Sequence, residues 1–463
     1  MEPIQLRTLC EWAEGELISG PSQSSGCDPE MLVTRLCTDS RALLPGDLFV
    51  PLRGENFDGH AFIEHAKAIG AIGALSEIDP PEHCARFAVI KVKDTLQALQ
   101  KIAGRYRRTL PLKAVAITGS NGKTSTKDFT AAVLGERFSV IKTEGNLNNH
   151  IGLPLTLLRA DRSHQMGVFE LGMNHPGEIA PLAGIAAPDL GIVTNVGTAH
   201  IEFMLTRDAI ADEKGALAEA ISEKGFVILS AEDDYSGSIA ARTRGKVILA
   251  GMGKGEIQAS EIRAEAWGSK FTVTSGEERA DAVISVPGEH MVRNALLAIA
   301  AGKALGMSLK ECCAGLAKAR LTKGRLEQKT VRGIEFLDDS YNANPDSVVA
   351  ALHTLSHIPA KGRRIAMLGR MNELGEQAEA GHRRVGAAAA AEKIDCIVSV
   401  GNGFAGLIAE SASQAGAREV FQTASIEEAT ELLRKIAVAG DLVLVKGSRT
   451  VGMERIVEGL AAL

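Results

Sequence analysis

Apolar residues in this chain recur in two patterns, one typical of helices and one typical of buried strands. Within residues 94–108, Leu96, Leu99, Ile102 and Tyr106 recur at helical spacing and predict an amphipathic helix. Arg107 is expected on the solvent-exposed face of that helix, together with its neighbouring arginines. Short apolar runs predict strands at 114–117, 167–169, 190–194, 226–229, 334–337, 364–368, 396–400 and 442–445.

Helical stretches separate most of these strands, and this alternation predicts parallel βαβ winding. Helices are expected at 124–133, 291–305, 346–355, 383–392 and 426–437. Residues 256–287 differ, because apolar and polar residues alternate there as in antiparallel strands. After Leu321 the strand–helix pattern starts again, which indicates a separately wound unit. We therefore expect an α/β protein with three domains, at residues 1–109, 110–322 and 323–463.

Composition agrees with this architecture and excludes one class of function. The chain has 463 residues, of which 45% are hydrophobic, so it can bury substantial cores. Its 51 basic and 57 acidic residues give a net charge of −6, and aromatic residues make up only 4%. A general nucleic-acid binder would need a basic face or aromatic stacking platforms, so we expect no nucleic-acid partner. The 48 glycines suit a fold with many tight strand-to-helix turns.

No segment predicts a membrane-inserted or secreted protein. The first residues, Met-Glu-Pro-Ile, lack the basic stretch of a signal peptide, and apolar runs such as 295–301 are too short to span a bilayer. The seven cysteines are odd in number and include no Cys-x-x-Cys pair. We therefore expect reduced, structural thiols in a cytoplasmic protein.

A candidate phosphate-binding loop, Thr-Gly-Ser-Asn-Gly-Lys-Thr-Ser at residues 118–125, lies between a predicted strand and a predicted helix. Its glycines leave room for backbone N–H groups around phosphate oxygens, and the helix N-terminus adds partial positive charge. Its lysine can reach the β- and γ-phosphates, and the following threonine can bind Mg²⁺. Ile117 stands where the common motif has its first glycine, so a chance match remains an alternative. The predicted ATP-binding residues here are Gly119, Ser120, Asn121, Gly122, Lys123, Thr124 and Ser125.

Two residues that follow predicted strands are candidate metal ligands. Glu170 ends the apolar run 167–169, and a phosphate loop needs an acidic partner for Mg²⁺ at the end of a neighbouring strand. His200 lies beyond the run 190–194, at the sheet edge where parallel sheets bind ligands. Taken alone, Glu170 could equally be a solvated strand end, and His200 an ordinary loop residue.

Further motifs follow in a fixed order, and together they resemble the ATP-dependent Mur ligases. The resemblance extends from about residue 38 to residue 449. Its motifs are the phosphate loop, Glu170, His200, and the segments 212–215 (DEKG), 290–296 (HMVRNAL), 324–327 (GRLE), 338–345 (DDSYNANP) and 446–449 (KGSR). Segments 38–52, 146–154 and 170–178 resemble the members of the family that add a dipeptide.

This resemblance implies a fold and a reaction. The fold would comprise an N-terminal UDP-substrate-binding α/β domain, a central ATPase-like parallel sheet with the phosphate loop, and a C-terminal Rossmann-like domain. ATP would phosphorylate the terminal carboxylate of UDP-MurNAc-tripeptide, and the amine of D-Ala-D-Ala would attack the acyl phosphate. Amide, ADP and phosphate would result, as a step of peptidoglycan precursor synthesis, and the protein would be a monomer.

The resemblance also implies a metal site with two Mg²⁺ ions, which suit the crowded negative charge of γ-phosphate and carboxylate. Thr124 and Glu170 would serve the nucleotide-associated ion, and His200 the second. Lys214 matches a lysine that the family carbamylates with CO₂, which turns a cation into an anionic oxygen ligand. The catalytic residues would be Lys123, Lys214 and His200, and no protein nucleophile is needed.

Other roles follow from the same matches. Asn294, Arg325, Asp339 and Asn344 would contact ATP. Ser40 and Arg41 would bind the UDP moiety, Asn149 the muramoyl-peptide, and Lys446 would approach the reacting centre. Two simpler readings stay open, in which residues 339–345 only cap the following helix and Ser40 only caps a turn. Arg370 replaces the aspartate usual in its family segment, so it receives no role.

Two alternative functions remain at this point. One is a related ligase that adds a single amino acid, or glutamate in folylpolyglutamate synthesis. The other is a nucleotide-dependent switch without amide chemistry, which would leave Lys214 and the segment 339–345 unexplained.

Overall fold

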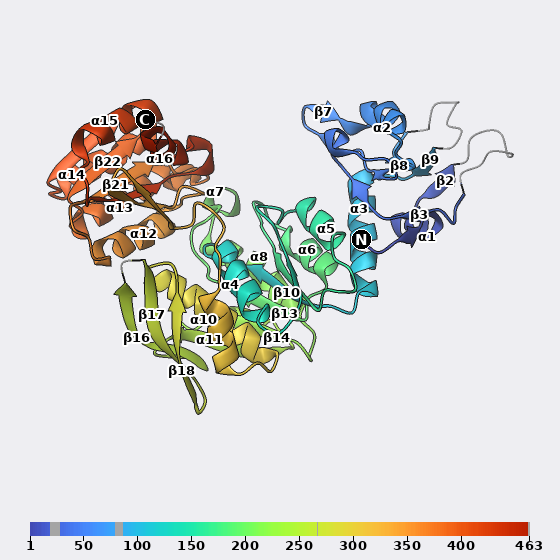
Figure 1. The fold of residues 1–463 in the computed structure, drawn as a ribbon, viewed down its shortest axis with the longest axis horizontal. Coiled ribbons are helices and arrows are strands. Elements are labelled where there is room, and N and C mark those ends of the chain that lie inside the picture. Colours follow the sequence, from blue (N-terminus) through green and yellow to red (C-terminus); the bar gives the residue numbers. More distant parts are fainter. Residues whose placement is uncertain (19–27, 79–86, 266, 462–463) are drawn as a thin grey trace. The chain divides into compact units, whose positions relative to one another are not determined.

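The computed structural model describes residues 1–463 except 19–27, 79–86, 266 and 462–463 (Figure 1). The chain forms two compact units. Both contain helices and largely parallel sheets, which confirms the predicted α/β class. Unit 1 comprises residues 1–114, 139–172 and 180–188. Unit 2 comprises residues 115–138, 173–179 and 189–463.

Unit 1 contains a five-stranded sheet in the order β2 (Glu16–Ile18), β9 (Ala88–Lys91), β8 (Gly73–Ser76), β5 (Leu48–Phe49) and β4 (Leu36–Cys37). All its neighbouring strands are parallel except β2 and β9. A parallel pair also joins β11 (Val140–Lys142) to β12 (Met166–Glu170). The helices are α1 (Leu6–Ala13), α2 (Ile63–Ile69), α3 (Thr95–Thr109) and α5 (Gly152–Leu157). Two short antiparallel pairs, β1 (Ile4–Gln5) with β3 (Leu32–Val33) and β6 (Arg53–Gly54) with β7 (Phe57–Asp58), complete the unit.

Helix α3 confirms the amphipathic helix predicted at 94–108. The side chain of Asp94 accepts a hydrogen bond from the Gln97 N–H, which satisfies one of the free donors at the helix start. On its buried face, the Tyr106 hydroxyl donates to the Ala160 carbonyl at 2.6 Å and accepts from the Glu2 N–H. Tyr106 thus links α3 to the start of the chain and to the segment that follows α5 (Gly152–Leu157).

The prediction for Arg107 is wrong, because this side chain is buried rather than exposed to solvent. Its guanidinium donates to the Ala186 carbonyl at 3.0 Å and to the Ala187 carbonyl at 3.3 Å. These oxygens lie at the C-terminal end of α6 (Ile179–Ala186), where carbonyl groups lack partners within the helix. The need for donors at that helix end therefore decides where Arg107 points.

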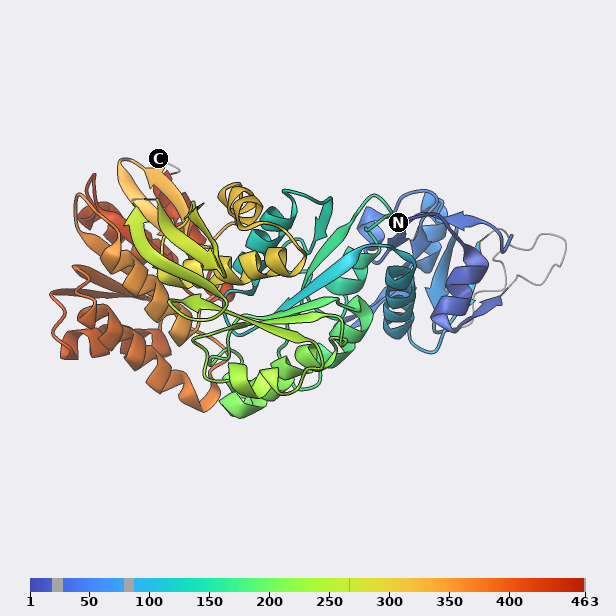
Figure 2. The same ribbon diagram turned by 90° about the horizontal axis from the view of Figure 1, so that it is seen from below.

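The first sheet of unit 2 begins with strands that run parallel and ends with three that form an antiparallel ribbon. The parallel strands are β10 (Lys113–Thr118), β13 (Leu190–Val193), β14 (Phe226–Ser230) and β15 (Lys246–Met252). The ribbon consists of β16 (Ile257–Glu265), β17 (Gly268–Ser275) and β18 (Glu278–Ile284), which lie side by side in Figures 1 and 2. This confirms the antiparallel excursion predicted at 256–287. The associated helices are α4 (Lys123–Leu134), α7 (Ile201–Met204), α8 (Arg207–Glu219), α9 (Ser236–Ala240), α10 (Glu289–Ala304) and α11 (Leu309–Ala317).

The second sheet of unit 2 has six strands in the order β19 (Glu327–Val331), β20 (Ile334–Asp338), β24 (Leu442–Lys446), β21 (Arg364–Gly369), β22 (Cys396–Val400) and β23 (Glu419–Thr423). All neighbours are parallel except β19 and β20, so the predicted Rossmann-like winding is confirmed. Its helices are α12 (Pro345–His357), α13 (Ala378–Ala391), α14 (Gly406–Gln414), α15 (Ile426–Ile436) and α16 (Glu454–Ala461).

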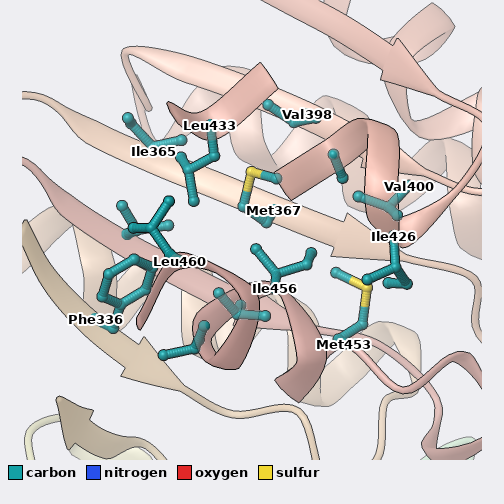
Figure 3. Packing of buried hydrophobic residues seen from close by; sticks show 14 of the residues in the cluster. Phe336, Ile365, Met367, Val398, Val400, Ile426, Leu433, Met453, Ile456 and Leu460 are labelled. Atoms are coloured by element: carbon teal, nitrogen blue, oxygen red, sulfur yellow. The ribbon is translucent and has the colours of Figure 1, made fainter. Parts of the chain in front are cut away.

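Helices α15 and α16 cover one face of this sheet with a continuous apolar core (Figure 3). Phe336 and Met367 from the strands meet Leu433 of α15 and Ile456 of α16, and all four are buried. Helix α13 begins five positions before the predicted start at 383. The prediction missed this first turn because it lacks strongly apolar residues. The sheet positions its carboxyl-end loops, including the segment 339–344, toward the functional residues described next.

Candidate active site

The loop between β10 and α4 has a backbone that only glycine can adopt at two positions. Gly119 has φ +147°, and a Cβ built there would lie 1.8 Å from the Thr194 Oγ1. Gly122 has φ +81°, and its Cβ would lie 2.4 Å from the Asn294 Oδ1. Glycine at both positions therefore allows the loop backbone to pack directly against Thr194 and Asn294, in a tight turn of the kind that phosphate-binding loops use.

Contacts with the segment after β13 hold this loop in shape. The Ser120 N–H donates to the Asn195 carbonyl at 2.9 Å, and the Asn121 N–H donates to the Asn195 Oδ1 at 3.0 Å. The Ser120 hydroxyl accepts from the Gly197 N–H at 2.8 Å. The Lys123 ammonium donates to the Gly119 carbonyl at 2.7 Å, which closes the loop on itself. The loop is therefore preformed, with Thr124 and Ser125 buried in the first turn of α4.

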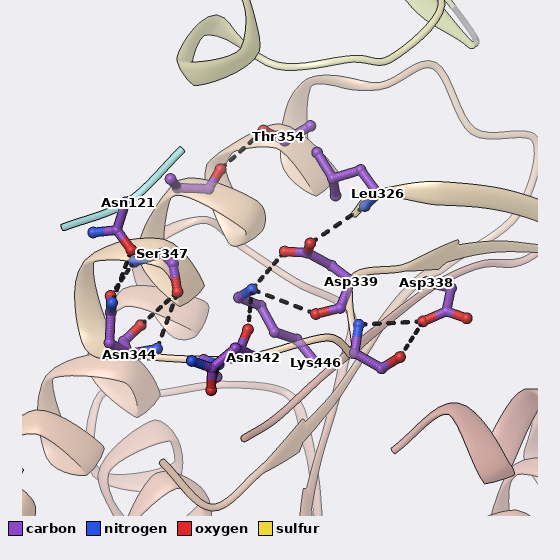
Figure 4. Close-up of polar contacts among 12 residues, drawn as sticks. Asn121, Leu326, Asp338, Asp339, Asn342, Asn344, Ser347, Thr354 and Lys446 are labelled. Atoms are coloured by element: carbon purple, nitrogen blue, oxygen red, sulfur yellow. Dashed lines mark hydrogen bonds and ion pairs between the residues drawn. The ribbon is translucent and has the colours of Figure 1, made fainter. Parts of the chain in front are cut away.

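Three predicted ATP-binding residues from later segments reach the same loop. Asn294 lies directly against Gly122. Arg325 donates to the Thr124 hydroxyl at 3.3 Å and stacks on the Tyr341 ring at 4.2 Å. Asn344 donates from Nδ2 to the Asn121 Oδ1 at 2.8 Å (Figure 4). The structure therefore brings these distant matches together around one loop.

Asn344 also begins helix α12, as the capping interpretation of this segment predicted. Its side chain accepts from the Ser347 N–H at 2.9 Å, and its own N–H donates to the Ser347 hydroxyl at 3.0 Å. Asp346, in the same first turn, accepts from the Thr198 N–H at 3.0 Å and from the Thr198 hydroxyl at 2.9 Å. Helix capping and contact with the phosphate-loop region are thus combined at one helix end.

Asp339 and Lys446 form a buried ion pair at the ends of β20 and β24 (Figure 4). The Lys446 ammonium lies 2.6 Å from the Asp339 Oδ2 and also donates to the Asn342 carbonyl at 2.9 Å. Burial lowers the pKa of Lys446, and the Asp339 carboxylate opposes that change. These contacts of Lys446 hold the segment 339–344 against the end of β24.

Lys214 is completely buried on α8, yet it has no carboxylate partner among the described residues. Its ammonium donates to the thioether sulfur of Met173 at 3.4 Å, a weak acceptor. Glu213, the adjacent acid, instead accepts from the Gly177 and Ile179 N–H groups. Burial, reinforced by the positive charge of Lys123, holds the pKa of Lys214 well below its usual value. Burial without a charged partner therefore favours the neutral amine form of Lys214.

His200 is paired with Glu373, an acid for which no role was predicted from the sequence. Its Nδ1 lies 2.6 Å from the Glu373 Oε2, and this contact is the main cause that lowers the pKa of Glu373. Both residues have positive φ, +62° for His200 and +60° for Glu373. Strained non-glycine residues persist where the surrounding structure holds them, and they cluster at functional sites.

Glu170 is the predicted metal ligand of unit 1. It is 2% exposed at the end of β12, where its Oε1 accepts from the Asn148 Nδ2 at 2.7 Å. Its Oε2 is buried and has no hydrogen-bond partner among the described residues. A buried carboxylate oxygen without a partner is costly, so its position fits a bound cation.

The predicted substrate contacts of unit 1 have local structural partners. Arg41 is exposed and pairs with Asp39 at 2.8 Å, which lowers the pKa of Asp39 to about 2. The Asp39 carboxylate also accepts the Arg41 N–H and so begins the short turn that contains Ser40. Asn149 accepts from the Gly152 N–H at 2.9 Å and orders the entry to α5. These contacts leave the Arg41 guanidinium at the surface, where a phosphate could displace its intramolecular partner.

Four residues of the site lacked a sequence signal of their own: Asn148, Met173, Tyr341 and Glu373. All of them lie inside or beside recognised segments, but nothing local indicates which neighbour each one meets. His382 is buried with a structural role: its Nδ1 donates to the Ala378 carbonyl, and its Nε2 accepts from the Met371 N–H. Arg370 lies 6.0 Å from the Phe404 ring and contacts none of the loop residues above.

The described cysteines are free thiols, as the sequence predicted. The five cysteines in the described residues are free and buried, and Cys27 and Cys84 lie outside the described part. Burial raises the pKa of Cys312 to about 12, of Cys313 to about 11 and of Cys396 to about 12. Within the described residues, no helix has the length and apolar character needed to cross a membrane.

Comparison with family models gives three matches in chain order. They are "Mur ligase family, catalytic domain" at residues 32–107, "Mur ligase middle domain" at 117–302 and "Mur ligase, glutamate ligase domain" at 324–449. The match that contains the phosphate loop begins within β10.

Curated relatives match over nearly their whole length. The UDP-N-acetylmuramoyl-tripeptide–D-alanyl-D-alanine ligase of Bacillus subtilis is 36% identical, with 98% of each chain covered. The ligase of the same name from Escherichia coli is 36% identical, with 99% of each chain covered. Among solved structures, MurF from Acinetobacter baumannii has a TM-score of 0.90 at 32% identity over 100% of both chains. MurF ligase from Thermotoga maritima in complex with ADP has a TM-score of 0.84 at 26% identity, over 93% of this chain and 97% of that one.

Proposed function

Because this chain belongs to the Mur ligase family, we propose that it joins D-alanyl-D-alanine to UDP-N-acetylmuramoyl-tripeptide in an ATP-dependent reaction of peptidoglycan precursor synthesis. The observation that supports this most strongly is the full-length similarity to ligases of that name. The preformed phosphate loop supports the use of ATP, as does the similarity to a structure that contains ADP. The carboxylate of the tripeptide is phosphorylated, the dipeptide amine attacks the acyl phosphate, and the tetrahedral intermediate collapses to amide and phosphate.

The residues around the loop fit a nucleotide. Gly119 and Gly122 allow the tight loop backbone that suits phosphate oxygens, and the start of α4 adds partial positive charge. Lys123, already held over the loop, can transfer its hydrogen bonds from the Gly119 carbonyl to phosphate oxygens. Arg325, stacked on Tyr341 and bonded to Thr124, is oriented to bind the nucleotide. We assign Ser120, Asn121, Ser125, Asn294, Asp339 and Asn344 to the ATP site on the same grounds.

The residues also fit divalent ions. We propose Thr124 and Glu170 as ligands for the nucleotide-associated Mg²⁺, with His200 and Lys214 serving a second ion. The support is the unpartnered Glu170 Oε2, held in place by Asn148, and the His200 ring, which Glu373 orients. When bound, Mg²⁺ offsets the negative charge that gathers where γ-phosphate and carboxylate meet.

For Lys214 we propose carbamylation. A buried amine with a lowered pKa is neutral and nucleophilic, so its nitrogen can attack CO₂, form a C–N bond and release a proton. The product has two carboxylate-like oxygens where the ammonium had only a thioether partner. The test is ¹³C NMR of the protein under ¹³CO₂: a carbamate signal that is absent in Lys214→Ala supports the modification. An identical spectrum in that variant contradicts it.

Ser40, Arg41, Asn149 and Lys446 complete the proposal as substrate-binding residues. Residues 1–109 would bind the UDP-substrate, 110–322 ATP, and 323–463 would form the ligase domain. We propose a cytoplasmic monomer, consistent with buried thiols and with UDP-linked small molecules as substrates.

The decisive assay measures phosphate release with ATP, Mg²⁺ and UDP-MurNAc-tripeptide. We expect release only when D-Ala-D-Ala is added. Equal turnover with single amino acids would favour the related single-residue ligase, and no turnover with any amine would favour a switch protein. Lys123→Ala is the matched control, since it should abolish turnover with every substrate.

A further inference from the structure

A second group of possible metal ligands lies at the far end of α12 from the nucleotide loop. His353 and His357 are separated by one helical turn, and Glu392 immediately follows the last residue of α13. One potential ligand atom from each of the three side chains lies within 4.8 Å of the others. None of these residues belongs to the ATP or substrate site described above.

The histidine spacing suits a transition-metal ion. Two histidines four positions apart project from the same helix face, which is the arrangement that helical zinc sites use. The rings lie close, with centroids 4.2 Å apart and planes inclined at 47°. Both side chains are accessible, since His353 is partly exposed and His357 exposed, so an ion can reach them from solvent.

The hydrogen bonds of the cluster leave nitrogen lone pairs available. The His357 Nδ1 lies 2.8 Å from the His353 carbonyl oxygen, so that nitrogen donates, and in the neutral ring the Nε2 then holds a lone pair. Metal-binding histidines commonly donate their second ring nitrogen to a carbonyl in this way. The His353 Nδ1 lies 2.9 Å from the Glu392 Oε1, so these two potential ligand atoms face one another.

The backbone around the cluster favours positive charge. Helix α12 ends at His357 and α13 ends at Ala391, so the partially negative ends of two helices converge on these side chains. Glu392 adds a full negative charge, and its pKa is lowered although burial acts against the charged form. The Ser356 hydroxyl donates a hydrogen bond to the other oxygen of that carboxylate.

We propose that His353, His357 and Glu392 form a binding site for a divalent transition-metal ion such as Zn²⁺, with water completing the coordination. The ion joins the last turn of α12 to the end of α13. The first turn of the same helix contains Asn344 and Asp346, which contact the phosphate-loop region. Ion binding therefore fixes the far end of the helix whose first turn contacts the nucleotide loop.

The test uses the full-length protein, freed of metal with EDTA and then kept in millimolar Mg²⁺. Calorimetry with Zn²⁺ and visible absorption with Co²⁺ should detect one ion that His353→Asn and His357→Asn each weaken by about tenfold or more. Asparagine keeps an N–H donor near the position of Nδ1, so a hydrogen-bonding role alone would survive in the His353 variant. His65→Asn, an exposed histidine on α2, is the matched control and should bind as the unmodified protein does.

Thermal unfolding provides a second readout that does not depend on activity. Zn²⁺ should raise the Tm of the unmodified protein and of His65→Asn, and leave the Tm of both cluster variants unchanged. The proposal is overturned if the cluster variants bind Zn²⁺ and Co²⁺ as tightly as the unmodified protein. It is also overturned if no ion binds beyond what the double variant His353→Asn/His357→Asn retains.

Discussion

Two buried lysines in unit 2 show opposite solutions to the same physical problem. Lys446 is 2% exposed and meets the Asp339 carboxylate and the Asn342 carbonyl. Lys214 is 0% exposed and meets a thioether. Burying an ammonium without such partners is costly, because water no longer solvates the charge. The contrast separates a lysine whose charge has buried polar partners from one that meets only a weak acceptor among the described residues, for which we propose a chemical role.

The largest effect should come from replacing Lys214. Lys214→Met preserves the length of an apolar stem and removes the amine, so turnover should fall by about 10²–10³-fold. Thermal stability should stay the same or increase, because no ion pair is broken. Short carboxylic acids should restore part of the activity if the amine acts as a carbamate. A fully active variant would contradict the chemical role of Lys214.

Lys446→Met should have the opposite effect, with a larger loss of stability than of turnover. Removing one member of a buried ion pair leaves the Asp339 carboxylate unpaired, and the free energy of unfolding should fall by about 3–5 kcal/mol. Urea unfolding measures this loss. The double variant Lys446→Met/Asp339→Leu should recover most of it. Equal losses in the single and double variants would mean that the pair contributes little.

The sequence alone was sufficient for the parts of this site that depend on local order. The phosphate loop, Glu170 at a strand end and Asn344 before a helix are all specified by the residues next to them. The partners of these residues were not predictable, because Asn148, Met173 and Glu373 act through contacts made in three dimensions. Arg107 illustrates the same limit: helical periodicity placed it in solvent, whereas the carbonyl groups at the end of α6 draw it into the protein.

The pH dependence of stability should distinguish the two lysines further. Both have a pKa lowered in the folded state, so the unfolded chain binds a proton that the folded chain lacks. Between the folded pKa and 10.5, stability therefore rises with pH, by up to about 1.4 kcal/mol per pH unit for one such group. In CO₂-free buffer without metal, the unmodified protein should gain stability over Lys214→Met as pH rises. The gain over Lys446→Met should be smaller, because the Asp339 carboxylate opposes the lowering of the Lys446 pKa. A larger gain for Lys446→Met than for Lys214→Met would contradict this order.

The smallest expected effect comes from replacing Tyr341, whose ring holds two arginine cations by cation–π contacts. Arg325 and Arg449 both lie over the Tyr341 ring, at 4.2 and 5.5 Å. Cation–π contacts of this kind contribute about 0.5–1 kcal/mol, so Tyr341→Leu should weaken binding of a non-hydrolysable ATP analogue by roughly two- to fivefold. Tyr341→Phe keeps the ring and should bind normally. Calorimetry checks both, and equal weakening in the two variants would point to the hydroxyl instead.

The protonation states of these side chains also determine which covalent inhibitors could react. Acrylamides and related electrophiles need a thiolate, and the thiols of Cys312, Cys313 and Cys396 are buried and protonated at neutral pH. The amine of Lys214 has a lowered pKa but is also completely buried, so only a small electrophile that reaches it, such as a small aldehyde, could capture it as an imine. Inhibitor chemistry for this enzyme should therefore be directed at an amine, and a covalent adduct would occupy the position proposed for the carbamate.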